Sequence, residues 1–219
     1  MRAVLVPGVP ALLPAYASLE DPVAALRAVC LAAVAWAGEG GPVDVVGTAQ
    51  GVRVGVSLVE AAGGVVSRQA LARLPQPPGG LDTPSLVPHD GYSTSDGGLD
   101  TPSLVPHDGY STTEGALPRD GYSTSEVSGL VVVGNGSAKR GEASPGYVDE
   151  RAVGFDAGLG ARLRAGDLAG VDHELARELW ADTAALAELA AVLPAGCAVT
   201  VDLEDDPFGV QYWVMRWEW

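Results

Sequence analysis

The residues Gly129–Val133 (GLVVV) form the most distinct strand pattern in the chain, and the loop Gly134–Ser137 (GNGS) follows them directly. A short, continuous apolar run that ends at glycine is typical of a strand buried on both faces of a sheet. Two earlier runs, Ala3–Val6 and Val43–Val46, have the same character, and each is followed by a glycine-containing turn. The sequence therefore predicts three buried strands.

Outside these runs, strand and helix signals alternate along the chain. Proline and glycine separate the segments, and aspartate stands where several helices are expected to begin. Such alternation predicts an α/β fold, a single domain whose mixed or mainly parallel central sheet is flanked by helices. The predicted helices are Pro22–Trp36 after Asp21, the stretch Leu58–Leu74 with a break at Gly63-Gly64, one capped by Asp149 or Asp156 that runs to Arg164, and His173–Leu193 after Asp172; the further strands are Val52–Val56, Ala198–Leu203 and Val210–Trp217.

A tandem repeat interrupts this pattern. Residues 81–94 (LDTPSLVPHDGYST) recur unchanged at 99–112, and a shortened copy (LPRDGYSTS) occupies 117–125. The surrounding insert, 75–128, is acidic and rich in proline, glycine, serine and threonine, which predicts a flexible loop within the domain of residues 1–219. Each copy has too few apolar side chains to stack into a solenoid, because stacked repeats bury a continuous core.

All three copies contain the sequence Asp-Gly-Tyr-Ser-Thr. Glycine places no side chain next to the aspartate, so the backbone amide that follows can reach the carboxyl group. The hydroxyls of serine, threonine and tyrosine are further modifiable groups. Short identical cores of this kind are similar to those of ribosomally made, modified peptide precursors, so we expect a partner enzyme to modify them; the alternative is a recently duplicated loop without a role. The core residues are Asp90, Gly91, Tyr92, Ser93, Thr94, Asp108, Gly109, Tyr110, Ser111, Thr112, Asp120, Gly121, Tyr122, Ser123 and Thr124.

Charge and composition narrow the classes of partner. The net charge of −15 argues against nucleic acid and anionic membranes, because both are bound through basic patches. No apolar run approaches the roughly 20 residues that cross a bilayer. The two cysteines, Cys30 and Cys197, lie far apart in apolar surroundings, which predicts reduced core thiols in a cytoplasmic protein.

Three segments carry a family resemblance: Gly129–Asp156, Asp205–Trp217, and the opening strand with Pro7–Pro14. Together they resemble actinobacterial proteins that are similar to the B subunit of class III extradiol ring-cleavage dioxygenases. The resemblance covers both sides of the repeat and implies a single α/β domain with helices on both faces of a central sheet.

Enzymes of that class hold Fe(II) with two histidines and a carboxylate. The family places its first histidine in the loop after the first strand, where this chain has Pro7–Pro10, and the loop Gly47–Gly51 after the second strand has no histidine either. The resemblance therefore implies the fold without ring-cleavage activity. No cofactor is predicted, and the chain is expected to be a non-enzymatic scaffold.

Two of the three histidines, His89 and His107, lie inside the repeat next to aspartates. As an alternative, they would bind Fe or Cu in a metal-dependent oxygenase or a self-modifying enzyme. Duplication alone also explains their matching surroundings. A further alternative is a non-enzymatic binding module.

The remaining candidates lie after the repeat. The loop residues Gly134, Asn135, Gly136 and Ser137, with Lys139 and Arg140 nearby, would offer backbone N–H groups to an anion, or form a tight turn. The third histidine, His173, is expected at the surface or in a helix cap. The aromatic side chains expected in the core are Tyr212, Trp213, Trp217 and Trp219.

Overall fold

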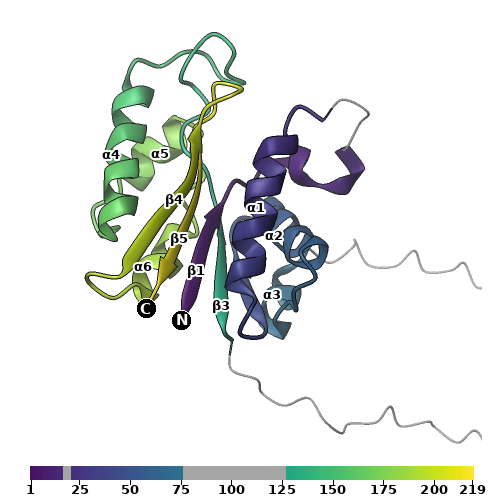
Figure 1. The fold of residues 1–219 in the computed structure, drawn as a ribbon. Helices are drawn as coiled ribbons and strands as arrows, with labels where there is room; N and C mark the ends of the chain where they lie inside the picture. Colours follow the sequence, from purple (N-terminus) through teal and green to yellow (C-terminus); the bar gives the residue numbers. More distant parts are fainter. Residues whose placement is uncertain (17–20, 76–126) are drawn as a thin grey trace, which may run out of the picture. The chain divides into compact units, whose positions relative to one another are not determined.

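Five strands form one mixed sheet in the order β2-β3-β1-β5-β4 (Figure 1). The computed structural model describes residues 1–16, 21–75 and 127–219, and these segments belong to one compact unit. The strands β1, β2 and β3 are parallel to one another, whereas β5 pairs antiparallel with both β1 and β4. The strand bounds are β1 Arg2–Val6, β2 Val43–Val46, β3 Gly129–Val133, β4 Ala198–Asp205 and β5 Tyr212–Glu218.

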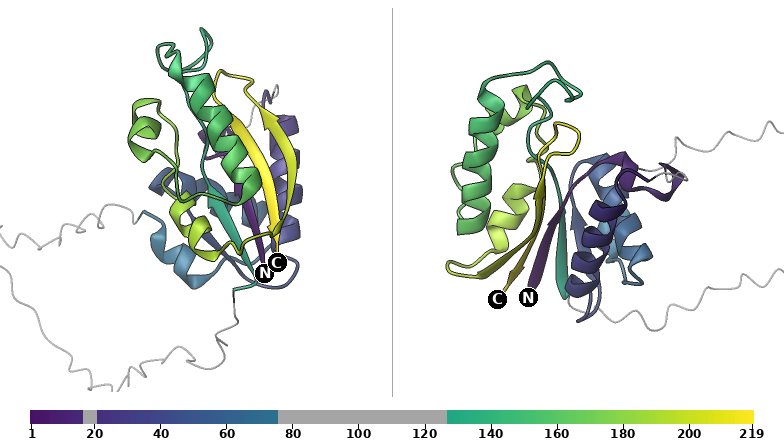
Figure 2. Two further views of the ribbon diagram at one scale, coloured as in Figure 1. Left: turned by 90° about the vertical axis from the view of Figure 1, so that its left-hand side faces the viewer. Right: turned by 45° about the horizontal axis from the view of Figure 1, so that its top comes forward.

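Helices cover both faces of this sheet (Figures 1 and 2). The helices α1, α2 and α3 pack on one face, and α4, α5 and α6 lie on the other, as Figure 2 shows from two further sides. This arrangement confirms the predicted α/β fold with a mixed sheet. The helix bounds are α1 Ala24–Ala37, α2 Ala49–Ala61, α3 Arg68–Arg73, α4 Arg151–Ala165, α5 His173–Glu178 and α6 Leu186–Val192, with short 3₁₀ turns at Pro10–Leu12 and Pro14–Tyr16.

The centre of the parallel strands is β3, whose five residues are all buried. Val131 pairs with Val4 of β1 on one side and with Val45 of β2 on the other. The side chains of β3 alternate between two apolar clusters, one under α1 and α2 and one under α4 and α6. The three predicted buried strands are therefore confirmed as the parallel part of the sheet.

The segment Val52–Val56, predicted as a strand, is part of helix α2. The alternation of Val52, Val54 and Val56 imitates a strand, but all three valines are buried because α2 packs against α1, α3, β2 and β3. The Thr48 hydroxyl starts the helix by accepting the amide hydrogen of Gly51 at 3.2 Å. A crossover was also required here, because β2 and β3 are parallel and cannot be joined by a hairpin.

The predicted helix His173–Leu193 is two helices, α5 and α6. The chain leaves α5 at Trp180, whose backbone φ of 58° is left-handed. Leu179 and Leu186 are seven residues apart and both buried, so the apolar spacing stays in phase across the break and conceals it. Asp172 caps α5 as expected, accepting the amide hydrogens of Glu174 and Leu175.

Smaller differences concern helix starts. Helix α1 begins at Ala24 rather than Pro22, and the Asp21 carboxylate accepts the amide hydrogen of Val23 and pairs with Arg27. For α4, Asp149 lies just before the first turn, whereas Asp156 is buried inside the helix and does not cap it.

The predicted core groups are confirmed where the structure describes them. Tyr212, Trp213 and Trp217 are buried in β5, and Trp219 packs against the cluster that contains Trp217. Both cysteines are free thiols; Cys30 is fully buried, and burial raises the pKa of its thiol to about 12, whereas Cys197 is only partly buried at the edge of the core.

Two helix glycines offer a matched test of this packing. A Cβ atom at Gly55 of α2 would lie 2.5 Å from Val45 Cγ1 and 2.9 Å from Val133 Cγ2, whereas one at Gly154 of α4 would meet nothing within 4 Å. We expect Gly55→Ala to lower the free energy of unfolding by about 1–3 kcal/mol, because β-branched neighbours in a packed core cannot give way. Gly154→Ala should raise it by about 0.5–1 kcal/mol. Urea denaturation of both variants measures these changes. If both substitutions changed the free energy of unfolding by the same amount in the same direction, the close approach of α2 to the sheet would be contradicted.

Candidate functional site

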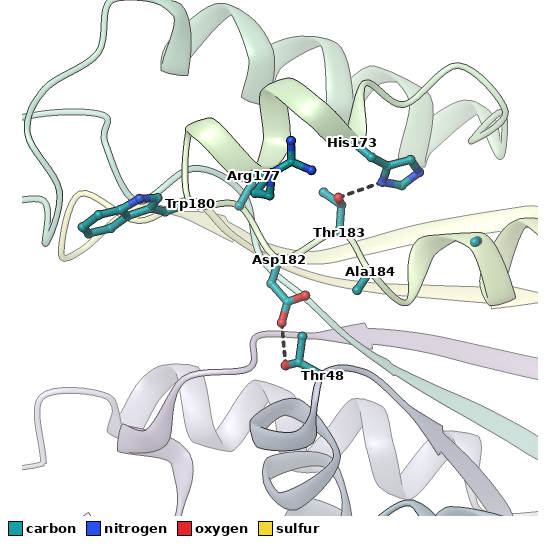
Figure 3. Close-up of a pocket in the computed structure, with 9 residues that line it drawn as sticks. Thr48, His173, Arg177, Trp180, Asp182, Thr183 and Ala184 are labelled. Carbon is teal, nitrogen blue, oxygen red and sulfur yellow. Dashed lines mark hydrogen bonds between the residues drawn. The ribbon is translucent and has the colours of Figure 1, made fainter.

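The carboxyl ends of the three parallel strands converge on Asp182. Its backbone pairs with Asn135, just after β3, through hydrogen bonds of 2.9 and 3.0 Å. Its carboxylate accepts a hydrogen bond of 3.0 Å from the hydroxyl of Thr48, which follows β2 (Figure 3). Gly8, which follows β1, approaches so closely that a Cβ atom there would lie 3.7 Å from Asp182 Oδ2. One residue thus lies across the ends of β1, β2 and β3.

This edge of the sheet is where the connections change face. The helices that follow β1 and β2 pack on one face, and the helix that follows β3 packs on the other (Figure 1). In open α/β sheets, ligands bind in the crevice outside the carboxyl ends of strands at such a change of direction. The fold therefore marks the surroundings of Asp182 as the candidate site.

A cavity of about 740 Å³ opens beside Asp182. Its volume lies within the range of roughly 300–1,000 Å³ that small-molecule sites occupy. Figure 3 shows side chains from α5, from the segment after it, and from the start of α2 around this space. The lining residues are Thr48, His173, Arg177, Trp180, Ala181, Asp182, Thr183, Ala184 and Ala187.

Partial burial governs the electrostatics of Asp182. Desolvation raises the pKa of its carboxyl group, and the hydrogen bonds from the Thr48 hydroxyl and the Ala184 amide oppose this rise without cancelling it. The group therefore keeps its proton to a higher pH than an exposed aspartate does, and it can donate or accept a hydrogen bond near a ligand.

Trp180 occupies a position that favours glycine. The amide of Trp180 donates to Arg177 O and the amide of Ala181 donates to Ala176 O, which is the hydrogen-bond pattern of a Schellman helix end. A left-handed non-glycine residue costs about 1–2 kcal/mol, and a bulky one is unusual. The Trp180 side chain is 56% exposed, so burial does not offset this cost. Strained residues of this kind cluster at functional sites.

Two further polar side chains share the face of α5 that lines the cavity. His173 and Arg177 are four residues apart, which places them on the same side of the helix. The His173 Nδ1 atom lies 3.0 Å from the hydroxyl of buried Thr183, and the Arg177 guanidinium has a long ion pair of 3.9 Å with Glu174. Both residues line the cavity. His173 is exposed, as predicted.

The loop Gly134–Ser137 is committed to the fold rather than open to an anion. Its neighbour Arg140 pairs with buried Asp156 and with Asp206, and Lys139 Nζ lies 5.1 Å from the centre of the Trp180 ring. The loop is not the tight turn of the other alternative, because Asn135 forms an antiparallel bridge with Asp182, and the anion-binding prediction has no free amide to support it. The four successive amides donate to Val6 O, Asp182 O, Gln211 O and Asp156 Oδ1, at 2.8–3.0 Å.

Most other predicted site residues lie outside the described residues. These are the three Asp-Gly-Tyr-Ser-Thr cores and the histidines His89 and His107. In residues 1–16, 21–75 and 127–219, no three His, Cys, Asp or Glu side chains form a group that would hold a metal ion. No helix in the same ranges has both the length and the apolar character that a membrane crossing requires.

Sequence reasoning missed Asp182 and Trp180. The signal that was present is Asp182-Thr183 within a predicted helix, because these residue types favour caps and turns over helix interiors. Comparison with known protein families, with curated proteins and with solved structures finds no match to this chain. The site therefore has to be argued from its own geometry.

The left-handed backbone at Trp180 can be tested by two substitutions. Both Trp180→Gly and Trp180→Ala remove the indole and its contact with Lys139, but only glycine relieves the positive φ. We expect the glycine variant to have a free energy of unfolding about 1 kcal/mol higher than the alanine variant. Thermal unfolding of the two proteins measures this; an alanine variant as stable as the glycine variant would show that the residue is unstrained.

The raised pKa of Asp182 predicts a pH dependence of stability. The folded protein binds this proton more tightly than the unfolded chain, so protonation of Asp182 stabilises the fold. The wild-type protein should therefore gain stability relative to Asp182→Asn as the pH falls from neutral toward about 4, the ordinary pKa of aspartate. This gain should vanish as the pH rises through the raised pKa. Urea titrations of both proteins across this range check it, and a difference that shrinks on acidification would contradict the burial of the carboxylate.

Proposed function

We propose that the chain is a catalytically degenerate scaffold, similar in fold to the extradiol dioxygenase B subunit, that carries its Asp-Gly-Tyr-Ser-Thr cores as substrates for post-translational modification. The observation that carries this proposal is the third copy, 117–125. It differs from the other two outside the core yet keeps all five core residues. In a duplicated loop without a role, substitutions would be expected inside the core as well as outside it.

The folded part supports a presenting role. The strand β3 follows the insert and lies between β1 and β2, so the same domain holds the chain on both sides of the repeat. The cores are therefore carried between two anchored segments, and one folded domain accompanies all three copies. A partner enzyme that binds the domain would meet three substrates in one chain.

The carboxyl edge of the sheet also supports a scaffold rather than a ring-cleaving enzyme. The loops Pro7–Pro10 and Gly47–Gly51 contain no histidine, and this edge presents Thr48 and Asp182 instead. The proposed reaction needs none of the dioxygenase ligands. A partner enzyme activates the core aspartate with a nucleoside triphosphate, and the following glycine amide or a nearby hydroxyl closes on the carboxyl carbon. A C–N or C–O bond forms, and one oxygen leaves with the activating group, so each core loses one water overall.

Peptide mapping of the protein from its native host tests this proposal. We expect a mass loss of one water per core, confined to the three Asp-Gly-Tyr-Ser-Thr sequences. Replacing Asp90, Asp108 and Asp120 by alanine should abolish the loss, because the reacting carboxyl group is removed. Replacing Asp82 and Asp100, which are acids of the same repeat without a following glycine, should leave it unchanged.

The mass of the protein from a foreign host, compared with its mass from the native host, distinguishes the competing functions. Protein produced alone in a foreign host should have the unmodified mass. The same loss appearing there after addition of iron or copper, and disappearing with His89→Ala and His107→Ala, would favour a self-modifying enzyme. An unmodified mass in the native host would leave a binding module with a duplicated loop.

A further inference from the structure

The cavity beside Asp182 plays no part in the proposed modification of the repeat. Its most unusual feature is Trp180, a 56% exposed residue with a strained backbone and with Lys139 Nζ 5.1 Å from the centre of its ring. An exposed, rigid aromatic ring at the wall of a cavity is a platform on which a flat ligand ring stacks. One end of the site is therefore suited to a planar ring.

The other end of the site is suited to an anion. Arg177 and His173 lie one helical turn apart on α5, and both line the cavity (Figure 3). The Arg177 side chain is 76% exposed, and its 3.9 Å pair with Glu174 is too long for a hydrogen bond, which leaves guanidinium donors for a ligand. Arg177 is the charged basic side chain among the residues that line the cavity, and His173 offers a ring nitrogen beside it.

Spacing along α5 indicates how the ring and the anion are connected. His173 begins α5 and Trp180 follows its end, and a helix of six residues is about 9 Å long, so the ring and the imidazole lie at opposite ends of this helix. A carboxylate attached directly to an aromatic ring is too short to span this distance, whereas a ring joined to its anion through a sugar can do so. Asp182 and Thr48 line the same cavity, and Figure 3 shows the Asp182 carboxyl group turned toward Thr48; this carboxyl group and hydroxyl are suited to sugar hydroxyls.

We propose that this crevice binds a nucleoside monophosphate. The base stacks on Trp180, the ribose hydroxyls bond to Asp182 and Thr48, and the phosphate lies at Arg177 and His173. This binding is independent of the repeat and of its modification, so either proposal can fail without the other.

Calorimetric titration of the full chain with AMP, GMP, CMP and UMP tests the proposal. At least one of the four should bind with a dissociation constant below about 1 mM. Adenosine, inorganic phosphate and benzoate should each bind at least about tenfold more weakly, because each lacks one part of the recognised group. Failure of all four nucleotides to bind at millimolar concentration would overturn the proposal. Benzoate binding as tightly as the best nucleotide would overturn the assignment in favour of a simple aromatic acid.

Variants locate the site. Trp180→Gly keeps a backbone suited to the helix end and should weaken nucleotide binding about fivefold or more, the effect of losing one stacking ring. Arg177→Gln should weaken nucleotide binding by a similar factor and leave adenosine binding unchanged. Arg164→Gln serves as the control. It removes another helix arginine, which pairs with Glu204 on β4 outside the cavity, and it should not change nucleotide binding. Nucleotide binding unchanged by both Trp180→Gly and Arg177→Gln would show that the crevice is not the site.

Discussion

The backbone pairing of β3 with two strands at once is the constraint on which the rest of the structure depends. Every residue of β3 is buried, and its hydrogen bonds join β1 to β2. Because β3 comes after the repeat and its two neighbours come before it, neither side of the chain can complete the sheet alone. The chain just after β3 is also closely packed, since a Cβ atom at Gly134 would lie 2.5 Å from Asp182 O. Glycine at this end allows the close approach of the segment that contains Asp182.

That close approach also creates the candidate site. Once Asn135 pairs with the backbone of Asp182, the chain after α5 must leave its helical path, and Trp180 takes up the turn. The break separates α5 from α6 and places the Asp182 carboxyl group beside Thr48 at the ends of the parallel strands. The strain at Trp180, the partial burial of Asp182 and the cavity beside them follow from one tertiary pairing. This is why the crevice and the sheet centre have to be considered together.

The sequence was sufficient for features that depend on local patterns and insufficient for those that depend on distant partners. The run Gly129–Val133 and the cap at Asp172 were predictable because composition and spacing determine them locally. The segment Val52–Val56 was misread because alternating valines fit a strand as well as a helix buried on several sides. Asp182 and Trp180 were missed because their positions depend on the backbone pairing of Asp182 with Asn135. These two partners are 47 positions apart in the sequence (182 − 135 = 47). The Asp-Gly-Tyr-Ser-Thr cores, in contrast, are evident only as a sequence pattern.

The central claim is that one domain, built from both flanking segments, carries the repeat between them. Its most direct test is a chain with a site-specific protease sequence in place of residues 95–98, between the first two copies of the repeat. After cleavage under native conditions, size-exclusion chromatography and native mass spectrometry should show the two fragments together as one particle that separates only in denaturant. Fragments that separate without denaturant would show that β3 does not unite the two segments, and would contradict the account.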